Sequence, residues 1–505
     1  MNQMKEKMTN YRWVICAMLF FATTINYLDR QVLSLTWKDF IAPEFHWTND
    51  DYGTIVSLFS LFYAVSMLIF GRLVDWMDTK KGFLWAIGIW SVGACLHAYC
   101  GIATSGIVAG KWLVGFEGAK EAIAGVGDVG LIVSVSVTLF IFARMVLAFG
   151  EAGNFPAAIK ATAEYFPKKD RAFSTSLFNT GAQIGALVAP LTIPVIAVKY
   201  GWEMSFIIIG ALGFLWMGFW VFIYKKPEKN PRVNAAELAY INQDSADDDH
   251  NRDADGKDKK ISFWKCFTFR QTWAFVGGKF LTDGVWWFFL FWTPAYLSDV
   301  YDLPSDNKTA QMLIFILYGI TMISMLGGYL PTYMVDKKKM EPYAGRMKSM
   351  LIFAFFPLLA LFAQPLGEYS YWFPIIIIGI AGAAHQAWSA NLFSTVGDMF
   401  PKSTIATITG IGGMAGGIGS FFINKGSGVL FDYTSGTTLI DNKVVVMTKD
   451  LMASGAEYVR QPMEFMGFEG INSGYFIVFC FCAVAYLLGW IIMKALVPKY
   501  KRITI

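Results

Sequence analysis

The chain alternates between long apolar runs and short polar breaks. The apolar runs are near 20 residues long, which as an α-helix crosses the roughly 30 Å hydrocarbon core of a bilayer. We place twelve of them at 13–37, 51–74, 82–100, 129–153, 171–195, 204–224, 270–296, 310–334, 348–364, 371–394, 404–424 and 474–496. The pattern therefore predicts an all-α membrane protein with twelve transmembrane helices.

Composition agrees with this class. Hydrophobic residues make up 55% of the 505 positions and charged residues only 16%, whereas soluble domains carry about 25% charged residues. The six cysteines show no metal-ligand spacing and are expected to be small packing residues. The first apolar run contains Asp29 and Arg30 and lacks a small-residue cleavage site, so it is expected to be a retained first helix.

Three polar segments divide the chain. Residues 225–262 are dense in charge and poor in apolar side chains, so they are expected to form a solvated linker. This linker separates an N-terminal six-helix bundle, 1–224, from a C-terminal one, 263–505. Each bundle carries an insertion, 101–128 in the first and 426–472 in the second. Charges such as Lys111, Glu117 and Asp128 interrupt the first insertion, which we interpret as interfacial or soluble rather than as a spanning helix.

The distribution of Lys and Arg predicts the orientation. Basic residues gather in the short connections on the side of both termini and of the linker, while the other side has few. By the positive-inside rule both termini and the linker are expected to be cytoplasmic, and both insertions extracellular.

The two halves also repeat a local pattern. A glycine, Gly71, precedes Asp75 and the basic turn Lys80–Lys81, and Gly327 similarly precedes Asp336 and a run of lysines. Internal repeats with a site at their interface near the bilayer midplane are typical of secondary transporters.

Several charged residues fall inside the apolar runs. A charge at the bilayer centre costs several kcal/mol, so such residues are functional candidates by default. They are three cations and three carboxylates: Asp29, Arg30, Arg144, Glu151, Lys279 and Asp283. Structural ion pairs that lock helices together are the alternative. Arg144 and Glu151 lie about 10 Å apart on one helix face, before an expected helix break at residues 153–156 and a basic loop.

A buried Arg–carboxylate pair offers a physical route from a proton gradient to anion uptake. Desolvation raises the pKa of a buried carboxylate and a neighbouring Arg lowers it. Protonation of the carboxylate frees the Arg, whose planar fork can bind a substrate carboxylate through two hydrogen bonds.

The sequence resembles the major facilitator superfamily, and within it the anion:cation symporters. The motifs of the first half are Asn26-Tyr27-Leu28-Asp29-Arg30, Gly71 with Asp75 and Lys80-Lys81-Gly82, Arg144 with Gly150-Glu151-Ala152-Gly153-Asn154-Phe155-Pro156, and Phe178-Asn179-Thr180-Gly181-Ala182-Gln183. The second half looks most like bacterial hexuronate transporters, through Lys279-Phe280-Leu281-Thr282-Asp283, Gly327-Gly328-Tyr329-Leu330-Pro331 and Ala384-His385-Gln386-Ala387.

The resemblance implies roles for these residues. Two pseudo-symmetric six-helix bundles would rock about a central site. Asp29 and Glu151 would be the proton-linked carboxylates, Arg30 the contact for the substrate anion and Arg144 its alternating partner. The turn with Asp75, Lys80 and Lys81, together with Asp336, would form a conformational latch at the cytoplasmic face. Helix capping and positive-inside anchoring are the alternative for that turn.

Recognition of a sugar acid also requires groups that bind hydroxyls. Candidates on the inner helices are Tyr27, Tyr63, Gln183, Trp286, His385, Gln386 and Trp388, although any single one of them is more often a packing residue. Lys279 and Asp283, at i and i+4 of one helix, are expected to pair, either as a second substrate contact or as a structural ion pair.

Together these patterns predict proton-coupled symport of a hexuronate or related sugar acid across the inner membrane of a bacterium. The partners would be the substrate anion, protons and the bilayer, without nucleic acid, cofactor or metal, and the protein would be a monomer. Transport of another organic anion and coupling to sodium are alternatives. A nutrient sensor would need an output domain. An enzyme would need a nucleophile–base pair or metal motif, which the four histidines do not form.

Overall fold

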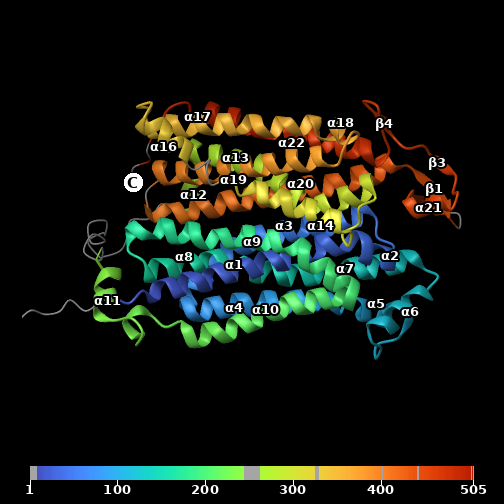
Figure 1. Cartoon of the computed structure of the whole chain (residues 1–505), viewed down its shortest axis with the longest axis horizontal. Helices are drawn as coiled ribbons and strands as arrows, with labels where there is room; N and C mark the ends of the chain where they lie inside the picture. Colours follow the sequence, from blue (N-terminus) through green and yellow to red (C-terminus); the bar gives the residue numbers. More distant parts are fainter. Residues whose placement is uncertain are drawn as a thin grey trace, which may run out of the picture.

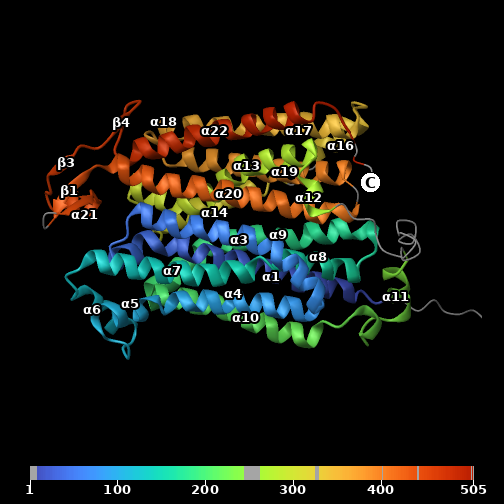
Figure 2. The same cartoon turned by 180° about the vertical axis from the view of Figure 1, so that it is seen from behind.

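The long helices run side by side in two groups. The computed structural model describes residues 8–243, 262–324, 329–400, 402–440, 443–501 and 503. In Figure 1 and Figure 2 the helices of the first half, blue to green, lie below those of the second half, yellow to red. Each half therefore forms its own bundle, and the two pack along their length.

The first bundle is built from α1 (Tyr11–Thr36), α3 (Asn49–Met77), α4 (Thr79–Ala98), α7 (Val129–Glu151) with α8 (Asn154–Tyr165), α9 (Lys168–Tyr200) and α10 (Trp202–Ile223). A π-helical turn η1 (Trp37–Ile41) and α2 (Ala42–Phe45) connect α1 to α3, and α5 (Cys100–Ala109) and α6 (Phe116–Ala124) connect α4 to α7. The α5–α6 connection lies at the end of the bundle opposite the beginning of α1 (Figure 1).

The second bundle follows α12 (Phe263–Cys266). Its helices are α13 (Arg270–Tyr301), α14 (Lys308–Thr321), α16 (Tyr329–Asp336), α17 (Pro342–Phe355) continued by η4 (Phe356–Phe362) and α18 (Ala363–Gly367), α19 (Trp372–Met399), α20 (Lys402–Ser435) and α22 (Ile471–Leu496). Between α20 and α22 lie β1 (Thr437–Ile440), β2 (Lys443–Val446), α21 (Lys449–Ala453), β3 (Tyr458–Arg460), β4 (Glu464–Phe465) and β5 (Phe468–Glu469). The strands form an antiparallel sheet in the order β2-β1-β3 and the pair β4-β5.

Seven helices of the described residues are long and apolar enough to cross a membrane, or eight if α4 and α5, bent by 49°, count as one span. Helices α1 and α13 are outside this group, and they carry the charged neighbours Asp29–Arg30 and the pair Lys279 and Asp283. The helical segments of the described residues group into six spans in each half, which makes twelve in all. The predicted twelve-helix architecture is confirmed.

Several helices differ from the predicted ranges, three of them in ways that matter for the fold. The helix that was expected to end in a basic loop after residue 153 resumes as α8 and continues to Tyr165. Pro156 lies in the first turn of α8, where its missing N–H removes no helical hydrogen bond. Helix α9 begins at Lys168 and ends at Tyr200, beyond both predicted ends, and α20 extends to Ser435, so it includes the first residues of the predicted insertion.

The linker is only partly as predicted. Residues 227–241 form η2 (Pro227–Lys229) and α11 (Ala235–Ile241), which pack against the beginning of α1. The buried carboxylate of Glu237 accepts hydrogen bonds from the backbone N–H of Tyr11 at 3.0 Å and of Arg12 at 3.1 Å, and forms a 3.1 Å salt bridge with Arg12. It satisfies free N–H groups at a helix N-terminus, and this explains why the segment is folded rather than solvated. The charge-dense part, 244–261, lies outside the described residues.

The two halves are hydrogen-bonded to each other at the end opposite α11. Asp432 of α20 accepts hydrogen bonds from the backbone N–H of Asn49 at 3.1 Å, from the Asn49 side chain at 2.9 Å and from the N–H of Asp50 at 2.7 Å. Lys38 forms a 2.8 Å salt bridge with Asp299. These contacts join the N-terminus of α3 and the turn η1 to the second bundle.

Candidate functional site

The guanidinium of Arg30 lies in the interior, paired with Glu151. Its Nε and Nη2 donate to the same oxygen of Glu151, Oε2, at 3.0 and 2.7 Å. The side chains of Arg30 and Glu151 are 3% and 0% exposed. This salt bridge connects α1 to the end of α7, where the α7–α8 interruption follows directly.

Aromatic rings from both bundles surround Arg30. The centroids of Tyr27, Phe59, Tyr63 and Trp287 lie 5.0, 5.6, 4.8 and 5.0 Å from its guanidinium carbon. Ring faces attract a cation at these distances without neutralising it. Trp287 belongs to α13, so Arg30 is at the interface of the two halves, as expected for a substrate site of a repeat-built transporter.

The charges around this pair are incompletely hydrogen-bonded. Within the described part of the chain, both oxygens of Asp29, Oε1 of Glu151, and Nε and Nη1 of Arg144 are buried without a hydrogen-bond partner. Arg144 donates from Nη2 to the backbone carbonyl of Arg30 at 3.4 Å, and its guanidinium lies 5.0 Å from the ring of Phe59. Arg144 therefore does not pair with Glu151 in this conformation.

Two buried amides adjoin the charges. Asn26 precedes Arg30 by one helical turn, and Asn154 follows Glu151 by three residues. Both are 0% exposed, and among the described residues none hydrogen-bonds to their side chains. Leaving a buried polar group unpaired costs about 1–3 kcal/mol, so this interior is suited to water or a polar ligand. Both residues belong to the family motifs quoted above, but nothing in the sequence distinguishes them from packing residues.

The second bundle holds another charge pair. Lys279 and Asp283 of α13 form the predicted i,i+4 salt bridge at 2.6 Å, and both side chains are largely buried. The ammonium lies 4.5 Å from the ring of Phe393. Trp287 follows Asp283 by one turn, so about 12 Å of α13 separates the backbone at Lys279 from that of the residue touching Arg30.

Three of the predicted hydroxyl-binding residues form a separate aromatic cluster in the second bundle. His385 stacks on Trp286 with a centroid distance of 5.4 Å, and its Nδ1 hydrogen-bonds to the hydroxyl of Tyr486 at 2.8 Å. Trp388 is fully buried, with its ring at 5.7 Å from Tyr486. The adjacent Trp287, rather than Trp286, is the tryptophan at Arg30. The sequence alone could not tell which of the two tryptophans faces Arg30. Neighbouring helix positions differ by about 100° around the helix axis, so the rotation of α13 decides which side chain faces the site.

The two remaining candidates for hydroxyl binding are both glutamines. Gln183 and Gln386 are half-buried, and Oε1 of Gln183 is buried without a partner among the described residues. Gln31 was missed: its side chain donates to the hydroxyl of Tyr318 at 2.7 Å and links α1 to α14 next to Arg30. A polar residue beside a buried Arg was the available signal.

The predicted latch is only partly described. Lys80 donates to the backbone carbonyl of Val221 at 2.6 Å, which is a contact inside the first bundle, and Lys81 is exposed. The side chains of Asp75 and Asp336 lie outside the described part of the structure. The latch stays a prediction.

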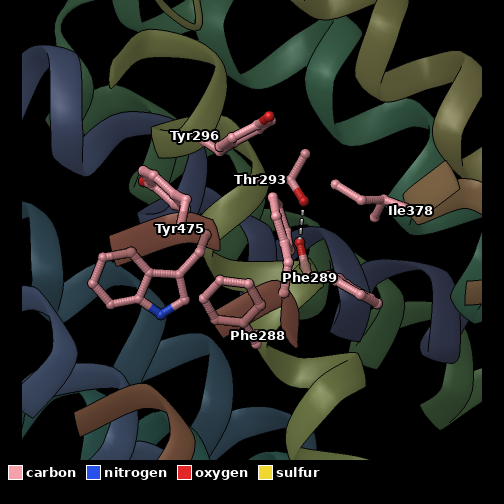
Figure 3. Close-up of a pocket in the computed structure, with 8 residues that line it drawn as sticks. Phe288, Phe289, Thr293, Tyr296, Ile378 and Tyr475 are labelled. Atoms are coloured by element: carbon pink, nitrogen blue, oxygen red, sulfur yellow. Dashed lines mark hydrogen bonds between the residues drawn. The ribbon is translucent and has the colours of Figure 1, made fainter. Parts of the chain in front are cut away.

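A small pocket elsewhere in the second bundle can be set aside as an anion site. Its lining consists of Phe288, Phe289, Trp292, Thr293, Tyr296, Ile378, Tyr475 and Phe479 (Figure 3). None of these side chains is charged, and their polar atoms already have partners: for example, Thr293 donates to the carbonyl of Phe289 at 2.6 Å and Tyr475 to Asp299 at 2.9 Å. An anion there would lose its hydration without a compensating positive charge.

A two-bundle helical fold with charge pairs buried in its interior is typical of secondary transporters. Residues 19–423 match the family pattern of the Major Facilitator Superfamily. The chain belongs to this superfamily. It is a multi-pass inner-membrane transporter and not an enzyme, as predicted.

The relatives whose names state a substrate are 25–27% identical to this chain. The chain is 27% identical to the hexuronate transporter of Escherichia coli K12 over 435 residues, covering 85% of this chain and 89% of that one. It is 25% identical to the galacturonate transporter of Dickeya chrysanthemi over 325 residues, with 64% and 83% covered. A probable galactarate/D-glucarate transporter of Escherichia coli K12 is 27% identical over 299 residues, with 58% and 61% covered.

Solved structures support the fold. A bacterial homologue of the human lysosomal transporter Spinster, inward-facing and occupied, aligns with a TM-score of 0.65 at 17% identity, covering 96% of this chain and 97% of that chain. A D-xylose–proton symporter aligns with a TM-score of 0.61 at 16% identity, covering 95% and 98%.

Proposed function

We propose that this transporter carries a sugar acid, a hexuronate or a close relative, together with protons. The observation that carries the proposal is the pairing of Arg30 with Glu151 in an aromatic enclosure built from both bundles. A fixed cation beside a neutralising carboxylate is a site where binding of a proton to the carboxylate can make the cation available to a substrate anion.

The coupling follows from charge balance. While Glu151 is ionised, one of its oxygens accepts hydrogen bonds from Nε and Nη2 of Arg30, and a second carboxylate would bring an uncompensated negative charge into a poorly solvated interior. Protonation of Glu151 removes this charge and leaves the fork of Arg30 to the substrate carboxylate. Asp29, which is adjacent on α1, is the second candidate for a transported proton, and Arg144 is the cation able to approach Glu151 or Asp29 when Arg30 is engaged.

The remaining end of the substrate would lie along α13. Trp287 touches Arg30, and Asp283 and Lys279 follow on the next two turns. A sugar acid bound at Arg30 would place its ring on Tyr27, Tyr63 and Trp287, with hydroxyls reaching toward the Lys279–Asp283 pair. Names of the relatives that carry hexuronate, galacturonate or galactarate/glucarate support this substrate class.

We also propose the orientation in which both termini and the linker face the cytoplasm. The excess of lysine and arginine at the end that holds α11 supports it. Bundles 1–224 and 263–505 would move as the two rocking units, with the Asp75–Lys80–Lys81 turn and Asp336 as the latch of the cytoplasmic face. The insertions would then be extracellular.

Uptake into proteoliposomes tests the proposal. Labelled galacturonate and glucuronate should accumulate when the lumen is alkaline relative to the outside, and accumulation should stop when a proton carrier removes the gradient. Accumulation driven only by a sodium gradient would replace protons by sodium. Absence of uptake of either sugar acid by a monodisperse preparation would leave another organic anion as the substrate.

A further inference from the structure

The loop between α5 and α6, residues 110–115, projects sideways from the first bundle. In Figure 1 and in the reverse view of Figure 2 it lies at the lower edge, pointing across the long axis of the molecule rather than beyond its end. Helix α5, which leads to it, is bent by 49° from α4. In a protein whose helices cross a bilayer, the space to the side of the bundle is occupied by lipid.

Local contacts fix the shape of this loop. Helix α5 ends at Gly110, which has a φ of +69°, and the next N–H, that of Lys111, donates to the carbonyl of Ser105 at 3.3 Å. The hydroxyl of Ser105 donates back to the carbonyl of Lys111 at 2.8 Å. The ring of Trp112 lies on Gly106, where a Cβ atom would stand 2.3 Å from the ring. The projection is therefore a defined element, like the glycine-terminated helix ends of other proteins.

The tip of the loop presents large apolar side chains. Leu113 is 103% exposed and Trp112 is 57% exposed. Single exposed apolar residues are ordinary on a protein surface, but these two are adjacent in sequence at one loop tip. Tyr99, at the end of α4, and Ile107, on α5, are 51% and 50% exposed. The segment from the end of α4 to the loop tip therefore carries four large, exposed apolar side chains.

The helix after the loop has the opposite character on its outer side. The charged residues of α6, Glu117, Lys120 and Glu121, are all exposed, whereas Ala119, Ala122 and Ile123 are buried against the protein. The connection thus has an apolar tip followed by a charged helix face, and the exposed Lys111 directly precedes the tip.

We propose that the α5–α6 loop is a lipid-docking element that inserts Trp112 and Leu113 into the headgroup–acyl boundary of the leaflet at the end opposite α11. Tryptophan and lysine are the residues that favour this zone, because each combines an apolar body with a polar end. The charged face of α6 stays in water. Such an anchor holds the first bundle at a fixed depth in the bilayer while the second moves.

Spin labels measure the depth directly. A nitroxide is attached at residue 113 or, as a control on the charged face of α6, at residue 120, in a protein whose six cysteines are replaced and which remains monodisperse. The protein is placed in nanodiscs that hold one copy each. We expect the label at 113 to be more accessible to oxygen than to a water-soluble nickel chelate, and the label at 120 to show the reverse. Equal, water-like accessibility at both positions would overturn the proposal.

Two glycine variants test the built geometry. Gly106→Ala pushes against the ring of Trp112 and should shift the label at 113 toward the nickel chelate. Gly127→Ala, in the next connection, has no atom within 4 Å of the added Cβ and should leave the label unchanged. In liposomes with several copies, dipolar broadening at 113 that disappears on dilution with unlabelled protein would identify a second copy, not lipid, as the occupant, and would also overturn the proposal.

Discussion

Two nitrogens of the Arg30 guanidinium, Nε and Nη2, donate to the same oxygen of Glu151, Oε2, while Oε1 of Glu151 has no hydrogen-bond partner among the described residues. Both hydrogen bonds of the pair therefore end at Oε2, and Oε1 can accept a proton without breaking either of them. This geometry separates the proton site from the contact that the proton controls, and the first two predictions test each side of it.

Glu151→Gln imitates the protonated carboxylate. We expect the variant to bind sugar acid and to exchange it across the membrane, because Arg30 is no longer neutralised. Concentrative uptake driven by a pH gradient should be lost, since no proton is carried at this position. Exchange and gradient-driven uptake in the same proteoliposomes measure the two activities. Glu121→Gln, on the exposed face of α6, is the control; normal accumulation by Glu151→Gln would exclude Glu151 from coupling.

Arg30→Lys keeps the charge and loses the planar fork. Loss of a charge-assisted contact in a poorly solvated site should cost roughly 2 kcal/mol or more, about a thirtyfold loss of affinity, and Arg30→Ala should be worse. Ligand titration of monodisperse variants is the measurement. If Arg30 is only a structural lock, Arg30→Ala reduces the yield of folded protein while the affinity of the remaining protein is unchanged, and the anion site moves to Arg144 or Lys279.

A glycine on α20 makes room for the second charge pair. A Cβ atom at Gly416 would stand 2.2 Å from Oδ2 of Asp283, the oxygen that holds Lys279. We expect Gly416→Ala to displace the carboxylate and to change the substrate affinity severalfold, in a direction that shows whether Lys279 or Asp283 binds the substrate. The matched control is Gly413→Ala, where the new Cβ meets only the side chain of Met67 at 3.5 Å. Equal affinities of both variants and the parent would leave Lys279–Asp283 as a structural pair.

Sequence was sufficient where one physical constraint decides the outcome. Hydrocarbon excludes unpaired backbone groups and charges, so the spans and the six buried charged residues, Arg30 among them, could be found from the apolar pattern. The sequence was insufficient where contacts between distant segments decide the structure. Helix resumes as α8 directly after Gly153, where the backbone lies close to Phe70 and Ala86, and residues 235–241 are folded because Glu237 caps α1.

The partners inside the site illustrate the same limit. Spacing predicted Lys279 with Asp283, because both lie on one helix. The pairing of Arg30 with Glu151 joins helices that are 121 residues apart in sequence, and pattern alone left both Arg30 and Arg144 as possible partners. Trp287 lies at the site because of the way α13 is rotated about its axis relative to α1. No periodicity in the sequence specifies that rotation.

Glu44 should make stability depend on pH. It lies in the α1–α3 connection, outside the spanning helices, where burial raises the pKa of its carboxyl to about 7 from the ordinary 4.5 and a 2.9 Å hydrogen bond from Trp202 opposes this rise. The folded state then binds more protons than the unfolded state between these values, so stability falls as pH rises from about 4.5 to about 7, by at most about 1.4 kcal/mol per pH unit. Thermal unfolding in detergent should lose this component in Glu44→Gln; an unchanged pH slope would contradict it.

Asp432 should control the opening of the end opposite α11. Its two oxygens accept three hydrogen bonds from Asn49 and Asp50, at the N-terminus of α3, where a carboxylate also interacts favourably with the helix dipole. Because Asp432 belongs to the other bundle, these bonds must break before the bundles separate at this end. Asp432→Asn removes the charge at nearly constant shape and should favour the open state by roughly 1–2 kcal/mol, about a five- to thirtyfold change in population.

Distances between spin labels at Lys120 in the first bundle and Val444 in the second report this opening, since both residues are exposed. In nanodiscs we expect Asp432→Asn to increase the share of long distances. Asp302→Asn is the matched control: Asp302 pairs with Lys449 at the same end but within the second bundle, so its loss breaks no contact between the halves. If the two variants give the same distance distribution as the parent, the capping of α3 by Asp432 stabilises the fold without governing the transport cycle.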